Sequence, residues 1–412
     1  MNNNHYLPSI RFAGFFEDWR QLKLRDCCEQ LFSSLNPQDT PTKVFTEYSM
    51  PAFDNGEIPN VVLGESMNSA RKVIDRQCLL INKLNVRKRR IWYIEAPESN
   101  AVCSSEFVPV VANGADLRFL KYVVSGDAFT SYLEDCSSGS SNSQKRVTPD
   151  VIMSAKIVLP DYKEQQIIGE LMAKLDEAIT LHRQQQERLI RVKEAMLRKM
   201  FPLPETSVPE IRFAGYSTPW KRGKLDTLVQ FSKGTGYSKA DLKSTGTPII
   251  LYGRLYTKYE TVITNVDTFA DERPGSIYSR GGEVIVPASG ETAEDISIAS
   301  VVEQPGVLLG GDLNIITPPE DIDSTFLAIS ISNGKPHADM AKMAQGKTVV
   351  HLHNTDLGKI DLLYPDYDEQ VKISTFFRGV DDMIALYTNK LIIMENMKKS
   401  MLQKLFPAVG RV

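Results

Sequence analysis

The chain has 412 residues and a formal net charge of −3; 42% of its residues are hydrophobic and 24% are charged. This composition is typical of a globular protein, and the length exceeds what one ordinary core holds, so we expect two to four domains. No apolar run reaches the roughly 20 residues of a membrane-spanning helix, and MNNNHYLPSI lacks the features of a signal peptide, so we expect no membrane association and a cytoplasmic location.

All five cysteines lie in the first third of the chain, and none of them forms a CxxC pair. No histidine stands beside them in a metal-ligand pattern, so we expect reduced, partly buried thiols rather than a metal site. The cysteines are Cys27, Cys28, Cys78, Cys103 and Cys136.

A ten-residue frame occurs twice in the chain. IRFAGFFEDW begins at Ile10, and IRFAGYSTPW begins 201 positions later at Ile211. A second repeat has an offset of 205: residues 160–202 align without a gap on residues 365–407, with 15 of 43 positions identical. The enclosed interiors, residues 25–155 and 226–358, share little. A period of this size indicates a duplicated domain and therefore a near-twofold internal repeat.

Each segment of the second repeat predicts one long helix. Both open with PDYxEQ, in which Asp161 or Asp366 can cap the first turn while Glu164 or Glu369 closes a capping box. Both end at Phe-Pro, because proline breaks the helical hydrogen-bond ladder. About 38 residues at 1.5 Å each give a rod of roughly 57 Å, much longer than a typical globular helix.

Apolar side chains recur every seven residues along both rods, which is the pattern of a coiled-coil seam. With only two such helices in the chain, each is the natural partner of the other, and we expect them to pack in antiparallel direction. The seam residues are Ile168, Leu175, His182, Leu189 and Met196 in the first rod, and Ile373, Val380, Tyr387, Met394 and Met401 in the second.

Short β-branched runs bounded by turn residues fill both interiors, such as CLLINKL in the first and GGEVIVPASG in the second. They are typical of mixed, strand-rich globules of about 150 residues. The chain is therefore predicted to be an α+β protein in which two globules alternate with two long helices. We expect the first globule at residues 1–157, the first helix at 158–203, the second globule at 204–360 and the second helix at 361–412.

No short motif completes a catalytic site. Gly-Lys-Thr at residues 346–348 ends like a phosphate-binding loop, but Ala341 stands where that loop requires its first glycine. The five histidines do not combine with cysteines or carboxylates into a metal cluster, and no acidic pair is spaced before a lysine as in a nuclease. We therefore expect a chain that is not an enzyme and holds neither cofactor nor metal.

What remains is a set of basic, polar and aromatic residues on predicted loops. Lysine and arginine suit contacts with DNA phosphates, whereas arginine, asparagine and glutamine suit the reading of base edges. An ordinary surface loop is the alternative interpretation of each. The candidates are Arg71, Lys83, Asn85, Arg87, Lys88, Arg89, Gln144 and Arg146 in the first globule, and Lys233, Tyr237, Lys239, Arg254, Lys258, Arg280, Lys347 and His351 in the second.

The order of these features resembles the specificity subunit of type I DNA restriction-modification systems. The resemblance rests on the duplicated IRFAG…W openings, on two divergent globules, and on two helices that begin with PDYxEQ and end with KxFP. It covers essentially the whole chain. INKLNVRK and CSSEFVPV in the first globule also resemble one recurring kind of target-recognition domain.

The resemblance implies that each globule is a target-recognition domain reading one half of a split target in double-stranded DNA. The two helices would form an antiparallel spacer that docks two modification subunits, and restriction subunits would add ATP-driven translocation and cleavage. In that family S-adenosylmethionine and the adenine methyltransferase site belong to the modification subunits, so no cofactor is expected in this chain.

A two-headed adaptor that joins proteins through its coiled coil and globules is the alternative, and it would lack DNA affinity even with its partners present. The net charge of −3 departs from what DNA binding suggests, so affinity would depend on partner subunits that close around the duplex. The sequence contains no residue-to-base code, and the target bases cannot be derived from it.

Overall fold

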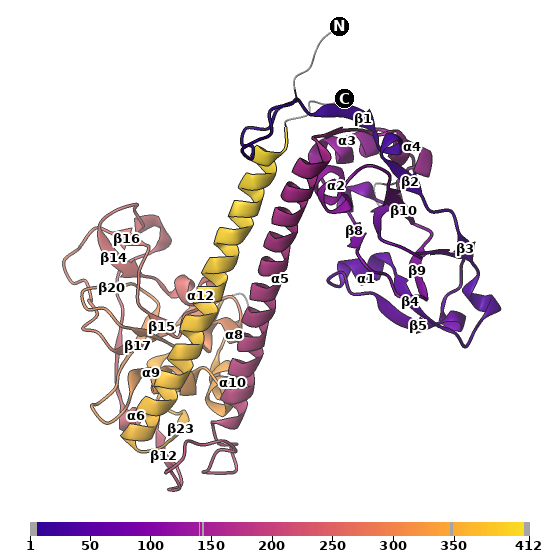
Figure 1. Cartoon of the computed structure of the whole chain (residues 1–412). Coiled ribbons are helices and arrows are strands. Elements are labelled where there is room, and N and C mark those ends of the chain that lie inside the picture. The colour runs from indigo at the N-terminus through magenta and orange to yellow at the C-terminus, as the bar shows by residue number, and fades with distance from the viewer. Residues whose placement is uncertain (1–5, 140, 142–143, 347–348, 408–412) are drawn as a thin grey trace. The chain divides into compact units, whose positions relative to one another are not determined.

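The computed structural model describes residues 6–139, 141, 144–346 and 349–407 (Figure 1). It divides into two compact units, Met1–His182 with Lys390–Val412, and Arg183–Asn389. Each unit contains one strand-rich globule and a part of both long helices. The predicted α+β class with two strand-rich domains is therefore confirmed. The expected segments at 1–157, 158–203, 204–360 and 361–412 divide the chain differently, since they give each helix a segment of its own.

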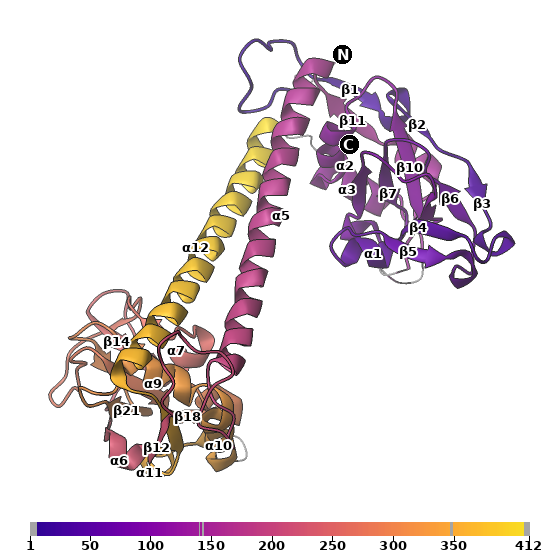
Figure 2. The same ribbon diagram turned by 60° about the horizontal axis from the view of Figure 1, so that its bottom comes forward.

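Eleven strands build the globule of the first unit in the described part of the chain (Figures 1 and 2). They are β1 (Arg20–Lys23), β2 (Cys28–Gln30), β3 (Ser34–Leu35), β4 (Val44–Tyr48), β5 (Asn60–Leu63), β6 (Arg71–Val73), β7 (Cys78–Asn82), β8 (Ile91–Ile94), β9 (Ala101–Ser104), β10 (Phe107–Ala112) and β11 (Lys156–Leu159). One sheet has the order β2-β10-β7-β8, a second has the order β3-β6-β9-β4-β5, and β1 pairs with β11. All of β7 is buried, because its unbroken apolar run packs on both faces.

Short helices cover these sheets: α1 (Met50–Asp54), α2 (Leu117–Val124), α3 (Asp127–Asp135), α4 (Pro149–Ser154), and the 3-10 turns η1 (Leu24–Asp26), η2 (Pro37–Asp39), η3 (Gly64–Ser66) and η4 (Val86–Lys88). Helix α2 begins where the Asp116 carboxylate accepts a hydrogen bond from the backbone N–H of Phe119 at 2.8 Å. Its Phe119 and Leu120 are fully buried, in one core with Leu79 and Ile81 of β7.

The globule of the second unit has sheets with different numbers of strands. Its strands are β12 (Lys221–Lys224), β13 (Gln230–Lys233), β14 (Thr247–Ile250), β15 (Val262–Ile263), β16 (Phe269–Ala270), β17 (Glu283–Pro287), β18 (Ser289–Gly290), β19 (Ser300–Val302), β20 (Leu308–Leu309), β21 (Leu313–Thr317), β22 (Val350–His351) and β23 (Asp361–Tyr364). The sheets have the orders β13-β21-β17-β19-β15 and β16-β14-β20, while β12 pairs with β23 and β18 with β22.

The helices of this globule are α6 (Leu225–Leu228), α7 (Tyr252–Thr257), α8 (Ala293–Ile296), α9 (Ser324–Ile331), α10 (Gly334–Met343) and α11 (Asn354–Leu357), with the 3-10 turn η5 (Lys239–Asp241). Every residue of α9 from Thr325 to Ile331 is buried. A helix that is apolar on all sides must lie inside its globule, so α9 is the centre around which the second core packs.

The long helices are α5 (Tyr162–Lys199) and α12 (Tyr367–Leu405), with 38 and 39 residues. In the first unit, Leu175 and Ile179 of α5 pack against Leu391 of α12. In the second unit, Met200 at the end of α5 packs against Ile373 and Phe377 of α12. The beginning of each helix thus lies beside the end of the other, so the two helices pack antiparallel in both units.

Two ion pairs between the helices are equivalent under the repeat. In the first unit, Lys398 Nζ of α12 lies 2.5 Å from Asp176 Oδ1 of α5. In the second unit, Lys193 Nζ of α5 lies 2.5 Å from Asp381 Oδ1 of α12. Each lysine and each aspartate has its counterpart 205 positions away, so the duplication extends to individual contacts between the helices.

Across the described residues, neither these two helices nor any other combines the length and hydropathy that a membrane-spanning segment requires.

Candidate nucleic-acid interface and the repeated junctions

A buried ion pair closes the repeated frame in each unit. Arg11 Nε and Nη2 donate to the two carboxylate oxygens of Glu164, both at 2.8 Å. Arg212 donates to Glu369 in the same two-bond arrangement at 2.7 Å. The glutamate side chains are only 0% and 1% exposed. These hydrogen bonds raise the pKa of both arginines, and the paired charges account for the arginine in each IRFAG motif.

The capping box expected at Glu164 is wrong for this reason. Both of its carboxylate oxygens accept hydrogen bonds from Arg11. They therefore form the ion pair and do not cap the first turn of α5. Asp161 provides the cap instead, since its Oδ1 accepts from the backbone N–H of Lys163 at 2.9 Å.

The glutamine that follows each glutamate ties its helix to the globule. In the first unit, Gln165 Oε1 accepts from the backbone N–H of Asp116, and its Nε2 donates to the carbonyl of Pro160, both at 3.0 Å. In the second unit, Gln370 makes the same two bonds, to Asp323 and Pro365, again at 3.0 Å. The PDYxEQ motif is therefore repeated because each of its last two side chains has a fixed, buried partner.

The tryptophan that ends each opening frame packs on a buried phenylalanine. The ring centroids of Trp19 and Phe119 lie 5.6 Å apart at an interplanar angle of 64°, and Trp220 and Phe326 have the same separation and angle. Edge-on packing of this kind is favoured between aromatic rings.

The phenylalanine of each closing Phe-Pro completes this aromatic cluster. Phe406, after α12, stacks on Phe119 with the centroids 5.3 Å apart, and Phe201, after α5, stacks on Phe326 at 5.8 Å. Backbone bonds of 2.9 Å join Ile10 N–H to the carbonyl of Lys404, and Ile211 N–H to that of Lys199. Each frame thus joins an opening motif to the end of a long helix, and we call these contacts the two junctions.

In the first globule the structure brings seven of the eight predicted DNA-binding residues together. Turn η4 presents the residues that precede β8, and the segment 144–147 runs beside it. The backbone N–H of Asn85 donates to the carbonyl of Lys145 at 2.9 Å, and that of Val147 donates to the carbonyl of Lys83 at 3.1 Å. We call this group the basic cluster: Lys83, Asn85, Arg87, Lys88, Arg89, Gln144 and Arg146.

The backbone of this turn is unusual, because Asn85 and Arg89 on either side of η4 have φ angles of 52° and 47°. Left-handed φ angles at residues other than glycine cost conformational energy, so the surrounding contacts must hold the turn in place. The Asn82 side chain does so, since its Nδ2 donates to the carbonyl of Leu84 at 2.8 Å and its Oδ1 accepts from the backbone N–H of Arg90 at 3.1 Å.

Carboxylates neutralise part of the basic cluster. Arg87 lies 2.7 Å from Glu134, Arg146 lies 3.0 Å from Glu106, and Arg89 pairs with Asp127. Three of the five cations therefore have an acidic partner, which leaves a net charge of +2 on the group. Lys88 is exposed and forms no ion pair with any described residue, so it is the cation most available to a phosphate.

The predicted residues of the second globule do not form such a cluster. Lys233 ends β13, Lys239 lies in η5, Lys258 follows α7, Arg280 precedes β17 and His351 lies in β22. All five are exposed. Lys258 Nζ is held 2.8 Å from Asp267 Oδ2, so one of them is already neutralised.

Two predicted contacts of the second globule are corrected, because their side chains are not on the surface. Arg254 is buried in α7, where it lies 2.6 Å from Glu260 and donates to the carbonyl of Asn265 at 3.1 Å. Tyr237 is also buried, and its hydroxyl donates to the carbonyl of Asp271 at 2.9 Å. Their roles are structural, since neither can reach a duplex outside the globule.

Two further candidates lie apart from these groups. Arg71 of β6 belongs to the other sheet of the first globule, where it is 13% exposed and its Nε lies 2.7 Å from Glu47 Oε1. Its contact with DNA stays a prediction, and the carboxylate partner makes it a weaker phosphate ligand than a free arginine. Lys347 lies outside the described residues.

The structure extends the repeat further into the globules than the sequence comparison does. Arg146 forms a bridge with Ser138, and His351, 205 positions after Arg146, forms the same antiparallel bridge with Gln345. Helices α4 and α11 follow at the same offset. Only the constant offset signals this equivalence in the sequence, because the residues themselves differ. Arg146 and His351 thus occupy equivalent places at the surfaces of the two globules.

No group of three or more His, Cys, Asp or Glu side chains within the described ranges is arranged to hold a metal ion.

Comparison with known proteins gives a consistent result. Residues 95–191 match the type I restriction modification DNA specificity domain. The MjaVIII type I restriction enzyme specificity subunit of Methanocaldococcus jannaschii is 21% identical over 277 residues, which cover 65% of this chain and 64% of that protein. The HindI specificity subunit of Haemophilus influenzae is 23% identical over 189 residues, or 45% of this chain and 41% of that protein.

The matched regions thus cover less than two thirds of either curated relative. The crystal structure of the S subunit of a type I restriction-modification system from M. genitalium shares 13% sequence identity and has a TM-score of 0.65. It covers 98% of this chain and 100% of the solved one, so it shows the fold over nearly the whole length. In its sequence and in its fold, this chain is similar to the specificity subunits of type I restriction-modification systems.

Proposed function

We propose that this chain is the DNA-recognition subunit of a type I restriction-modification complex, in which each globule reads one half of a bipartite target. The observation that carries the proposal is the contrast between the junctions and the globules. The junctions repeat contact by contact, whereas the two globules differ in the number of strands in their sheets and in the arrangement of their exposed cations. A duplicated frame with two different faces suits two different half-sites on one duplex.

The basic cluster supports the role of the first globule. Its exposed Lys88 suits a phosphate contact, while Asn85, Gln144 and Arg146 have the side chains that hydrogen-bond to base edges. The ion-paired arginines Arg87 and Arg89 are held in fixed positions, which favours defined contacts over loose electrostatic attraction. In the second globule Lys233, Lys239, Lys258, Arg280 and His351 take these roles from separate elements.

The long helices support the docking of two modification subunits. Their outer faces carry large apolar residues, and each of these is more than one third exposed in the described part of the chain. In the first unit these are Ile167, Leu181, Ile392, Ile393 and Met397, and in the second they are Ile190, Val192, Met383 and Leu386. Exposed apolar residues in such number on helices favour contact with partner proteins.

Under this proposal the chain itself is not catalytic. S-adenosylmethionine and the adenine methyltransferase site would belong to the modification subunits, and restriction subunits would supply ATP-driven translocation and cleavage. The complex would work in the cytoplasm, where it meets double-stranded DNA. The adaptor alternative differs in one measurable respect, because it predicts no DNA affinity for the chain with its modification subunits.

Exchange of one globule tests the proposal. Residues 225–360 are replaced by the second globule of another specificity subunit, so that β12, β23 and the Arg212–Glu369 ion pair stay intact. The hybrid is expressed with the modification subunit, and methylated adenines are mapped across a genome. We expect one half of the bipartite site to change and the other half, set by the first globule, to stay the same.

The reciprocal exchange of residues 24–155, between β1 and β11, is the matched control and should change the other half only. A hybrid that alters both halves, or that leaves both unchanged, would contradict the assignment of one half-site to each globule. Loss of all methylation is interpreted only after the hybrid is shown to fold and to bind its modification subunit.

A further inference from the structure

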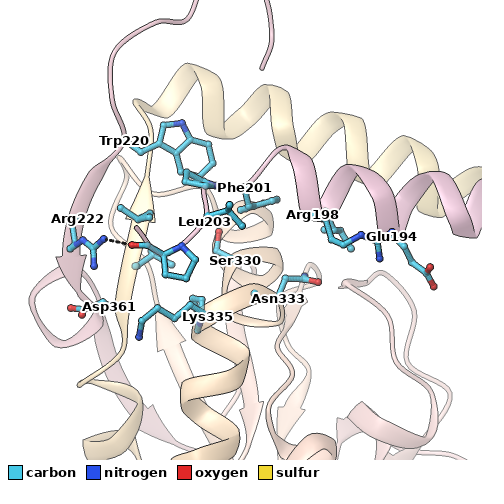
Figure 3. A pocket seen from close by; sticks show the side chains of 17 residues that line it. Glu194, Arg198, Phe201, Leu203, Trp220, Arg222, Ser330, Asn333, Lys335 and Asp361 are labelled. Atoms are coloured by element: carbon cyan, nitrogen blue, oxygen red, sulfur yellow. Dashed lines mark hydrogen bonds between the residues drawn. The ribbon is translucent and has the colours of Figure 1, made fainter. Parts of the chain in front are cut away.

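A cavity of about 400 Å³ lies in the second unit, beside the second junction (Figure 3). Its walls come from the end of α5, from the segment that follows it, from the β12–β23 pair and from the start of α10. Most of the wall is apolar, with contributions from Leu197, Phe201, Leu203, Trp220 and Leu363. A volume of this size accommodates a large side chain together with the backbone beside it.

Two buried polar groups at this cavity have no partner among the described residues. The hydroxyl of Ser330, near the end of α9, accepts and donates no hydrogen bond although the residue is only 4% exposed. The indole N–H of Trp220, also 4% exposed, is unpartnered as well. Buried polar groups are normally satisfied, so the unsatisfied hydroxyl in the wall is available to a polar group that enters the cavity.

Charged side chains of both signs line the mouth of the cavity. Figure 3 shows Arg222 and Lys335 on one side and Arg198 on the other, with Leu203 and Ser330 between them. The Arg198 side chain forms no hydrogen bond or ion pair with any described residue, and Arg222 donates only to the carbonyl of Pro204, at 3.0 Å. Lys335 is already paired with Asp339. Although Glu194 and Asp361 also line the cavity, neither forms an ion pair with the two arginines.

We propose that this cavity is a docking site for an acidic segment of a partner protein, which inserts one large apolar side chain. The apolar wall suits that side chain, the Ser330 hydroxyl suits a backbone amide or carbonyl next to it, and Arg198 and Arg222 suit flanking carboxylates. Guanidinium groups without a carboxylate partner favour this chemistry, because they bind carboxylates through two parallel hydrogen bonds. This inference does not rest on DNA recognition by the globules.

The test uses the full chain and a fluorescein-labelled octapeptide of sequence Gly-Ser-Glu-Glu-Phe-Glu-Ser-Gly, with binding followed by fluorescence anisotropy. We expect saturable binding with a dissociation constant of about 100 µM or tighter. Replacement of the phenylalanine by alanine removes the anchor, and replacement of the glutamates by lysines inverts the charge. Each change should weaken binding by about tenfold or more.

The protein variant Arg198→Gln with Arg222→Gln should weaken binding to the same degree. The first unit has Gln403 and Gln21 at the equivalent positions, so glutamine is compatible with this fold. Arg188→Gln is the matched control, because Arg188 is an exposed arginine of α5 that does not line the cavity. It should leave the dissociation constant unchanged.

A second variant, Ser330→Val, removes the hydroxyl from the wall. Valine also occupies the equivalent position of α2, Val123, so the change should not disturb the helix. We expect it to weaken binding by at least about threefold. Absence of saturable binding below about 1 mM, or equal binding of all three peptides, would overturn the proposal. So would binding that the double arginine variant leaves unchanged while the variant stays folded by circular dichroism.

Discussion

The two junctions and the two globular surfaces of this chain have diverged to very different degrees. The junction in the first unit and the junction in the second use the same residue types at the same geometry: a buried arginine–glutamate pair, a bonded glutamine and stacked aromatic rings. The globules between them differ in the number of strands in their sheets and in the distribution of their exposed cations. Repetition is thus strongest where distant segments of the chain must meet.

Burial explains this difference. A buried carboxylate such as Glu164 or Glu369 needs an opposite charge at hydrogen-bonding distance, so neither member of the pair can change alone. An exposed lysine such as Lys88 or Lys239 is solvated whether or not it has a partner, so its position can vary at little cost. The junctions therefore constrain the sequence, and the surfaces leave it free to acquire two specificities.

The largest expected effect comes from breaking one buried pair at a time. Glu164→Ala leaves Arg11 without its partner and should destabilise the first unit by about 3–5 kcal/mol, and Glu369→Ala should do the same to the second unit. The cysteines report on opening of the first unit alone, since all five lie in it. They therefore distinguish the two variants. Burial raises the pKa of Cys103 to about 12 and also raises that of Cys78, so these thiols should resist alkylation at pH 8 until the unit opens.

The measurement is the rate of thiol labelling in each variant, with exposed Cys136 as an internal standard that reacts in all of them. Glu164→Ala should accelerate labelling of Cys78 and Cys103, whereas Glu369→Ala should lower the melting temperature of the chain with much less effect on that labelling. If both substitutions accelerated labelling equally, the junctions would not stabilise their units separately. Glu164→Gln and Glu369→Gln keep a hydrogen-bonding side chain and should cost less.

Removing the lysine from each of the two equivalent ion pairs between the helices should have a smaller effect on stability. The two losses should also differ from each other. Lys398→Met leaves Asp176 with the Tyr122 hydroxyl at 2.8 Å and Lys121 at 3.8 Å. Lys193→Met leaves Asp381 with only the Thr261 hydroxyl, at 3.0 Å, among its described contacts. We expect losses of about 0.5 kcal/mol and about 1 kcal/mol respectively, measured as free energies of unfolding in urea.

The Lys398 variant should lose less stability than the Lys193 variant because of the globules. The remaining partners of Asp176 belong to α2 in the first unit, and the remaining partner of Asp381 belongs to the segment before β15 in the second. Equal losses would mean that the globules contribute nothing to the stability of the helix pair. The double variant of Lys193 and Lys398 should show the sum of both losses, since the two pairs share no residue.

The smallest effect concerns single phosphate contacts. In the complex with its modification subunits, Lys88→Ala should weaken DNA binding about equally for all sequences and reduce the slope of log affinity against log salt by about 0.9. Lys258→Ala should change the slope less, because Asp267 already neutralises this lysine. The measurement is fluorescence anisotropy of a labelled duplex at several salt concentrations.

A change in the preferred base at one position, rather than a uniform loss, would show that Lys88 contacts a base edge. Equal changes in slope for Lys88→Ala and Lys258→Ala would mean that Asp267 releases Lys258 when DNA binds. Either result would show how the clustered cations of the first globule and the dispersed cations of the second differ in their contacts with DNA.

Local patterns in the sequence were enough to predict the architecture of this chain. Two repeats at offsets of 201 and 205, with heptad patterns and proline ends, were sufficient to predict two globules and two long helices that pack antiparallel, because these features depend on local periodicity. The same reasoning located Lys83, Asn85 and the residues 87–89, because a run of basic residues between two predicted strands forms a surface turn.

The positions and partners of the other residues became clear only from the folded chain. Nothing local distinguishes Arg254, which is buried in α7, from exposed Lys258 a turn later, and nothing local marks Glu164 as the partner of Arg11, 153 residues away. Burial and pairing over such distances are properties of the packed globule, which is why the expected surface positions of Tyr237 and Arg254 were wrong. The equivalence of Arg146 and His351 likewise emerged only from their matching backbone bridges.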